Sequence, residues 1–203
     1  LLQRGKQLEA LGRDVIHMEI GEPDFPTPLA VTEAACAFIR TGEVKYTAPA
    51  GLPALRHSIA DFYLNRYGVH VDPARIFVTP GASGAFLIAF AITLNSGQSL
   101  MMADPCYPCN ENFLHLLGAK AQYVPVDAIT RFHLDADLVH RHWQSHTAGV
   151  LIASPANPTG TLIDDQEFSK IAQYVDDKQG FFFSDEIYHG LTYGRQARTA
   201  LSY

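Results

Sequence analysis

Apolar side chains recur along this chain with two different spacings. Up to residue 67 they are spaced as on one face of a helix, which predicts helices over residues 28–41 and 53–67. Gly42 and Gly68 follow these two stretches, and glycine is the usual residue just past a helix end. The opening sequence LLQRGKQLEALGRDVI also reads as part of a helix.

Beyond residue 75, short apolar runs alternate with helical stretches. Strands are expected at the runs IFVT (76–79), SLMMA (99–103), KAQYVPV (120–126), GVLIAS (149–154) and FFFSD (181–185). The helices between them are expected to start at Gly84 and to cover residues 110–117, 135–142 and 164–175. Strands that alternate with helices of about 10 to 15 residues predict βαβ units. The fold class is therefore α/β, with a mainly parallel sheet covered by helices on both faces and one structural domain overall.

Composition narrows the function classes. The chain of 203 residues has a formal net charge of −6, whereas nucleic-acid binders normally carry clustered Lys and Arg. Its apolar runs are shorter than the roughly 20 residues that span a bilayer. We expect a cytoplasmic protein that acts on small molecules, with neither nucleic acid nor membrane as a partner.

Cysteines and histidines give weaker signals. The three cysteines fit a reducing compartment, and Cys106 and Cys109 form a C-x-x-C that is either a redox or zinc half-site or incidental. The incidental reading is favoured because the sequence offers no second Cys or His pair at metal-ligand spacing. No metal is expected, and four histidines are interpreted as surface residues: His133, His140, His142 and His146.

In a sheet of this kind, ligands bind at the carboxyl ends of the strands, where the connecting loops gather. The loops after the expected strands include TPGASGA, ADPCYP, ASPANPTG and SDEIYHG. In the first of these, backbone N–H groups and the helix dipole can hold a phosphate, with the Ser83 hydroxyl as an added donor. The alternative is a plain strand-to-helix turn, since the loop is neither a P-loop nor a G-x-G-x-x-G dinucleotide turn.

The other loops carry single candidate side chains. Asp185 ends a very apolar strand, so its carboxylate needs a cationic partner such as a protonated pyridine nitrogen, or else it caps the next segment. Tyr188 is either a phenolic donor into the same crevice or a half-buried surface aromatic. Asn157 lies in a proline-stiffened turn that fixes its amide, although turn chemistry alone would explain it. Tyr107 either stacks on a flat ring or packs in the core or at the rim.

Taken in order, the segments GEPDFPTP, YTAPAGLPALR, TPGASGA, DPCYP, SPANPTGT and SDEIYHG resemble the fold-type I, class I/II aminotransferases, which depend on pyridoxal 5'-phosphate. The resemblance runs throughout the chain, and SPANPTG and SDEIY are highly specific to that group. It implies that the cofactor phosphate lies on the turn from Gly81 to Gly84, contacted by the N–H groups of Ala82 and Ser83. The cofactor ring would stack under Tyr107.

The resemblance implies further roles in the loops. Asn157 and Tyr188 match positions that hydrogen-bond the ring hydroxyl, and Asp185 matches the carboxylate paired with the pyridine nitrogen. Tyr46 matches a tyrosine that reaches across a dimer interface to the phosphate of the other subunit, so a homodimer is implied. Gly21 matches a glycine that lines the substrate side. Without the resemblance, Tyr46 is a loop aromatic and Gly21 a turn residue.

The Schiff-base lysine of this family is expected beyond Tyr203, together with arginines for the phosphate and for the substrate carboxylate. The lysines of this chain fall outside the matching context, so no catalytic residue is assigned within it and it is not expected to turn over alone. Residues 1–40 are expected to form an N-terminal segment with the first helix. Residues 41–203 are expected to form an incomplete cofactor-binding large domain, truncated before the last strands and the small C-terminal domain.

The implied function is transfer of an amino group between an L-amino acid and a 2-oxo acid. The same scaffold also serves C-S lyases and other fold-type I enzymes, and it serves as the cofactor-binding effector domain of transcription regulators. A regulator would need a basic winged helix upstream, and the segment GEPDFPTP is more typical of an enzyme.

Overall fold

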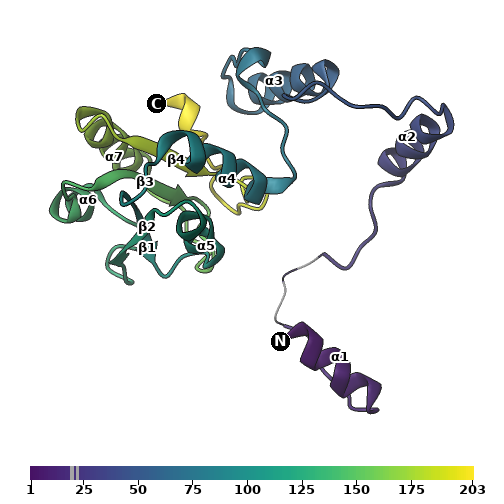
Figure 1. The fold of residues 1–203 in the computed structure, drawn as a ribbon, viewed down its shortest axis with the longest axis horizontal. Helices are drawn as coiled ribbons and strands as arrows, with labels where there is room; N and C mark the ends of the chain where they lie inside the picture. The colour runs from purple at the N-terminus through teal and green to yellow at the C-terminus, as the bar shows by residue number, and fades with distance from the viewer. Residues whose placement is uncertain (19–20, 22) are drawn as a thin grey trace. The chain divides into compact units, whose positions relative to one another are not determined.

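The computed structural model describes residues 1–18, 21 and 23–203, so Glu22 of the GEPDFPTP segment lies outside the described residues. The chain divides into two units, Leu1–Thr47 and Ala48–Tyr203. The first unit holds the helices α1 (Leu2–Ala10) and α2 (Leu29–Arg40), which confirms both helices predicted there (Figure 1).

The second unit contains a sheet and several helices (Figure 1). Its helices are α3 (Pro53–Tyr67), α4 (Gly81–Thr93), α5 (Cys109–Leu116), α6 (Ala136–His142) and α7 (Asp165–Asp177), with 3₁₀ turns at Pro73–Arg75 and Ala200–Ser202. Its strands are β1 (Ser99–Asp104), β2 (Lys120–Pro125), β3 (Thr147–Ala153) and β4 (Phe181–Asp185). They lie in the order β2-β1-β3-β4, and all three neighbouring pairs are parallel. The predicted α/β class is confirmed.

Side chains of the strands alternate between two apolar cores, one on each face of the sheet. On β1, Leu100 and Met102 belong to the core formed with α4 and α5, whereas Met101 belongs to the core formed with α6 and α7. On β3, Leu151 joins the first core and Val150 the second. Helices therefore cover both faces, as the alternation of strands and helices along the sequence predicted.

Local sequence chemistry sets several boundaries. Gly68 ends α3 in the left-handed conformation, with φ 70°, which glycine adopts without steric cost. Asp135 and Asp164 cap α6 and α7 with their side chains. Gly149 of β3 lies opposite Phe181 of β4, and a Cβ at this glycine would overlap the Phe181 carbonyl oxygen. None of the helices in the described part of the chain is long and apolar enough to cross a membrane.

The strand predicted at IFVT (76–79) is wrong. Ile76 has extended backbone angles, φ −100° and ψ 126°, and the Val78 N–H donates to the Ala50 carbonyl at 3.0 Å. Within residues 23–203, however, this run pairs with no strand of the sheet. An apolar extended run becomes a strand only where a neighbouring strand completes its hydrogen bonds. The helix expected to start at Gly84 begins earlier, at Gly81.

Candidate functional site

A pocket lies where the carboxyl ends of β3 and β4 meet the start of α4. It encloses about 670 Å³ of empty space, part of it open to solvent. We call it the strand-end pocket, and its lining residues are Ala82, Ser83, Phe86, Tyr107, Phe113, Ala153, Asn157, Asp185, Ile187 and Tyr188. Six of the predicted site residues therefore line one cavity: Ala82, Ser83, Tyr107, Asn157, Asp185 and Tyr188.

The start of α4 leaves backbone donors open on one side of this pocket. Gly81 has φ +72°, and its N–H donates to the Thr79 carbonyl at 2.8 Å in a tight turn. No side chain among the described residues caps α4. The N–H groups of Ala82 and Ser83 lie in its first turn, where no preceding helical carbonyl can accept them. Together with the positive end of the helix dipole, they form a site suited to an anion.

Asp185 supplies a carboxylate to the same pocket. It is the last residue of β4, opposite Ala153, and its carbonyl accepts the Ser154 N–H at 3.0 Å, which ties the ends of β3 and β4 together. Its Oδ1 accepts the Ile187 N–H at 3.2 Å. Burial raises the pKa of the Asp185 carboxyl, and the nearby charge of Glu186 raises it further. A carboxylate in this position is stabilised by a cationic hydrogen-bond donor.

Asn157 and Tyr188 bring two polar groups together on the pocket wall. The Asn157 Nδ2 donates to the Tyr188 hydroxyl at 3.4 Å, although one residue follows β3 and the other follows β4. The turn that holds Asn157 is closed by a hydrogen bond from the Gly160 N–H to the Ala156 carbonyl at 2.7 Å. An amide and a phenol in contact can together bind one oxygen of a ligand.

Aromatic and apolar side chains form the rest of the wall. The Tyr107 ring is partly exposed, and a hydrogen bond to Cys109 raises the pKa of its hydroxyl. Phe86, Phe113 and Ile187 also line the pocket, and the sequence prediction missed them. Phe86 and Phe113 fall in apolar helical stretches, where an aromatic side chain in the core and one in a pocket have the same sequence pattern.

Tyr46 and Gly21 belong to the first unit, and both are exposed there. Their predicted roles at a dimer interface and on the substrate side stay predictions.

The interpretation of His133 as a surface residue is wrong, because only 5% of its surface is exposed. Its ring contacts Thr161, and histidine is buried readily when such a partner is available. The thiol of Cys106 is half-buried, and burial together with Asp104 and Glu111 raises its pKa to about 11. A thiol of that pKa stays protonated at neutral pH, so Cys106 is not a reactive thiolate.

The chemistry of the strand-end pocket fits pyridoxal phosphate. Open N–H groups at the start of α4 suit its phosphate, and the half-buried carboxylate of Asp185 suits a protonated pyridine nitrogen. Asn157 and Tyr188 suit the ring hydroxyl, and Tyr107 offers a flat face. The donors and acceptors therefore correspond to the parts of the cofactor group by group.

Comparisons with known proteins identify the relatives of this chain. The family described as aminotransferase class I and II matches residues 13–202. The chain is 36% identical over 190 residues to a valine–pyruvate aminotransferase of Mycobacterium tuberculosis, covering 94% of this chain and 49% of that protein. It is 30% identical over 199 residues to an aspartate aminotransferase of Bacillus subtilis, covering 98% of this chain and 51% of that protein.

A solved structure of an aminotransferase from Mycobacterium tuberculosis superimposes with a TM-score of 0.92 at 35% identity, covering 98% of this chain and 51% of that chain. The chain thus spans about half the length of the curated relatives it matches.

Proposed function

Because this chain belongs to the class I and II aminotransferase family, we propose that it is an incomplete portion of a pyridoxal-phosphate-dependent aminotransferase. The reaction is transfer of an amino group between an L-amino acid and a 2-oxo acid. The observation that carries the proposal is the strand-end pocket, where a half-buried carboxylate, an uncapped helix start and an amide–phenol pair converge.

Each group of the pocket has a role in this proposal. Ala82 and Ser83 hold the cofactor phosphate, and Asn157 with Tyr188 holds the ring hydroxyl. Asp185 would keep the pyridine nitrogen protonated, and a protonated nitrogen would in turn stabilise the charge of this half-buried carboxylate. When bound, the cofactor supplies an electron sink for the carbanion left when the Cα proton of the amino acid departs.

Tyr107 would offer its flat face to the cofactor ring from the pocket wall. The Schiff-base lysine lies beyond Tyr203 in this proposal, and the working unit is a cytoplasmic homodimer to which Tyr46 and Gly21 contribute. The division into residues 1–40 and 41–203 is part of the same proposal. The relatives are named for different amino acids, valine and aspartate, so the substrate is proposed at the level of L-amino acids.

The test uses the full-length protein. Pyridoxal phosphate is added, borohydride fixes it to any lysine that carries it, and peptide mass spectrometry locates the modification. We expect a single modified lysine beyond Tyr203. Absence of a specific modification, or modification at one of the lysines of this chain, would contradict the proposal.

Activity is then measured with a panel of L-amino acids and 2-oxo acids. Amino transfer should require both substrates. Release of ammonia without a 2-oxo acid would instead identify a lyase, and cofactor binding without turnover of any substrate would favour an effector domain.

A further inference from the structure

His133 is a buried group that the proposed function leaves unused. It lies in the loop between β2 and α6, and 5% of its surface is exposed. Burial lowers the pKa of the imidazole, and the charge of Arg131 lowers it too, whereas a hydrogen bond to Thr161 raises it. The neutral ring is therefore favoured, with one nitrogen as donor and the other as acceptor.

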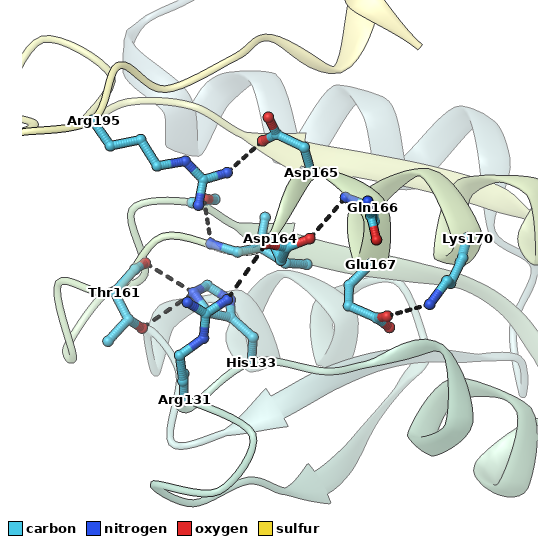
Figure 2. A network of polar contacts seen from close by, with 11 residues as sticks. Arg131, His133, Thr161, Asp164, Asp165, Gln166, Glu167, Lys170 and Arg195 are labelled. Carbon is cyan, nitrogen blue, oxygen red and sulfur yellow. Dashed lines mark hydrogen bonds and ion pairs between the residues drawn. The ribbon is translucent and has the colours of Figure 1, made fainter.

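The ring of His133 reaches the turn that follows β3. Its Nε2 lies 2.8 Å from the Thr161 carbonyl oxygen and 3.1 Å from the Thr161 hydroxyl (Figure 2). Because a carbonyl oxygen can only accept, Nε2 carries the hydrogen and donates it to Thr161. The Thr161 hydroxyl also contacts the Thr159 hydroxyl at 2.9 Å.

Thr161 closes the turn of residues 156–161. Its carbonyl oxygen also accepts the Ala156 N–H at 2.9 Å, so the hydrogen bond from His133 occupies the second acceptor position of that oxygen. Asn157 lies inside this turn, and its amide reaches the Tyr188 hydroxyl in the strand-end pocket. The histidine is thus linked to a pocket residue through the bond that closes the turn.

The loop that presents His133 has an unusual backbone. Arg131 and Phe132 are consecutive non-glycine residues with φ 52° and 58°, in the left-handed region that such residues rarely adopt. The Phe132 N–H donates to the Asp127 carbonyl at 2.7 Å and holds this shape. Arg131 lies 3.9 Å from Asp164, just beyond the turn (Figure 2). Strain of this kind persists only where the surroundings fix it, and it concentrates at functional sites.

A second cavity also brings His133 and Asn157 together. His133 and Asn157 line it together, and it also shares Tyr107 and Ala153 with the strand-end pocket. His133 and the turn that carries the Asn157 amide therefore face the same cavity.

We infer that His133 is a positioning residue, which holds the turn of residues 156–161 so that the Asn157 amide faces the strand-end pocket. The inference rests on the proposed function, because it acts through the role of Asn157 toward the cofactor. It assigns His133 no contact with the substrate or the cofactor.

A double-mutant cycle in the full-length protein tests it. The dissociation constant of pyridoxal phosphate is measured for wild type, His133→Phe, Asn157→Ala and the double variant. His133→Phe keeps a flat ring but removes the donor, and we expect about tenfold weaker binding. In the Asn157→Ala background the same change should have little effect, since residues that act through one another are not additive.

Hydrogen exchange gives a readout apart from the cofactor. In the cofactor-free protein, His133→Phe should speed exchange of the Ala156 and Gly160 amides, which close the turn, and leave the Ser154 amide unchanged. His133→Gln places an amide donor near the Nε2 position and should restore binding and exchange. His146→Gln, at an exposed histidine of the next loop, is the matched control.

The outcomes separate the two proposals. Additive effects in the cycle, or unchanged exchange at Ala156 and Gly160, would overturn the role of His133. A wild type that shows no saturable binding of pyridoxal phosphate would contradict the proposed function, while the exchange measurement still decides whether His133 holds the turn. If His133→Phe does not fold, His133→Asn, whose amide is too short to reach Thr161, takes its place in both measurements.

Discussion

Helices α4 and α7 begin in opposite ways. At α7, the Asp164 side chain accepts the Gln166 N–H at 2.9 Å, and the next carboxylate, Asp165, is paired with Arg195 (Figure 2). Asp165 also lies 3.8 Å from Arg198. The Asp164 carboxylate thus accepts an N–H group of the first helical turn, and the arginines compensate the charge of Asp165.

At α4 the same kinds of groups are left open. The side chains of the described residues give this helix no cap, and the Asp185 carboxylate in the same pocket accepts the Ile187 N–H while burial raises its pKa. Open polar groups of both signs at one pocket destabilise a fold unless a ligand with both charges binds there. Paired groups at α7 therefore hold structure, whereas open groups at α4 and β4 suit a ligand with an anionic and a cationic end.

The largest expected effect comes from the open carboxylate. Asp185→Asn in the full-length protein should lower kcat for amino transfer by about a hundredfold to a thousandfold, because an amide cannot stabilise a protonated pyridine nitrogen by charge. Steady-state kinetics measures this loss. Asp177→Asn, at an exposed carboxylate of α7, is the control and should be near wild type. Near-normal activity of Asp185→Asn would refute the assignment.

Converting the start of α4 into one like that of α7 should have the next largest effect. Ser83→Asp places a carboxylate where the phosphate is proposed to bind, and binding of pyridoxal phosphate should weaken by about thirtyfold. The cofactor-free helix should be slightly stabilised, since an acidic side chain in the first turn favours a helix. Fluorescence titration measures the affinity, and Ser145→Asp, at an exposed loop residue, controls for the added charge. Unchanged affinity would show that the phosphate does not bind at this turn.

Much of the fold and of the candidate site could be predicted from the sequence. Apolar runs predicted β1 to β4, and Asp135 and Asp164 were placed at the starts of α6 and α7 by their helical patterns. The strand ends carry the unusual polar residues, so the candidate site followed from the rule that ligands bind at the carboxyl ends of parallel strands. Asp185 stood out because a carboxylate at the end of an apolar strand requires a partner.

The failures have tertiary causes. The run at residues 76–79 is as apolar as β3, but strand formation depends on a neighbour that the sequence of the run does not encode. His133 was misjudged because a histidine is buried or exposed according to the partner it finds, and Thr161 lies 28 residues away. The sequence contains one indication that His133 is buried, because this histidine lies between two apolar residues, Phe132 and Leu134.

A smaller effect concerns stability without the cofactor. The folded-state pKa of Asp185 is raised, so the folded protein binds this proton more readily than the unfolded chain, and stability falls as the pH rises through the folded-state pKa. Asp185→Asn mimics the protonated form. Above that pKa, the cofactor-free variant should therefore melt at a higher temperature than wild type, and the gap should shrink as the pH is lowered. Thermal scans at several pH values measure it, and a lower melting temperature of the variant at neutral pH would contradict the open-carboxylate interpretation.

The smallest expected effect concerns the capped start of α7. Asp164→Ala removes the cap of α7 and should speed hydrogen exchange of the Gln166 amide by about fivefold, the equivalent of about 1 kcal/mol for a lost helix cap. Asp164→Asn keeps an accepting oxygen and should exchange like wild type. The ion pair with Arg131, at 3.9 Å on the surface, should add little to either variant. Because α7 lies outside the strand-end pocket, cofactor affinity should stay unchanged. A loss of affinity in Asp164→Ala would show that the capped start of α7 also supports the uncapped start of α4.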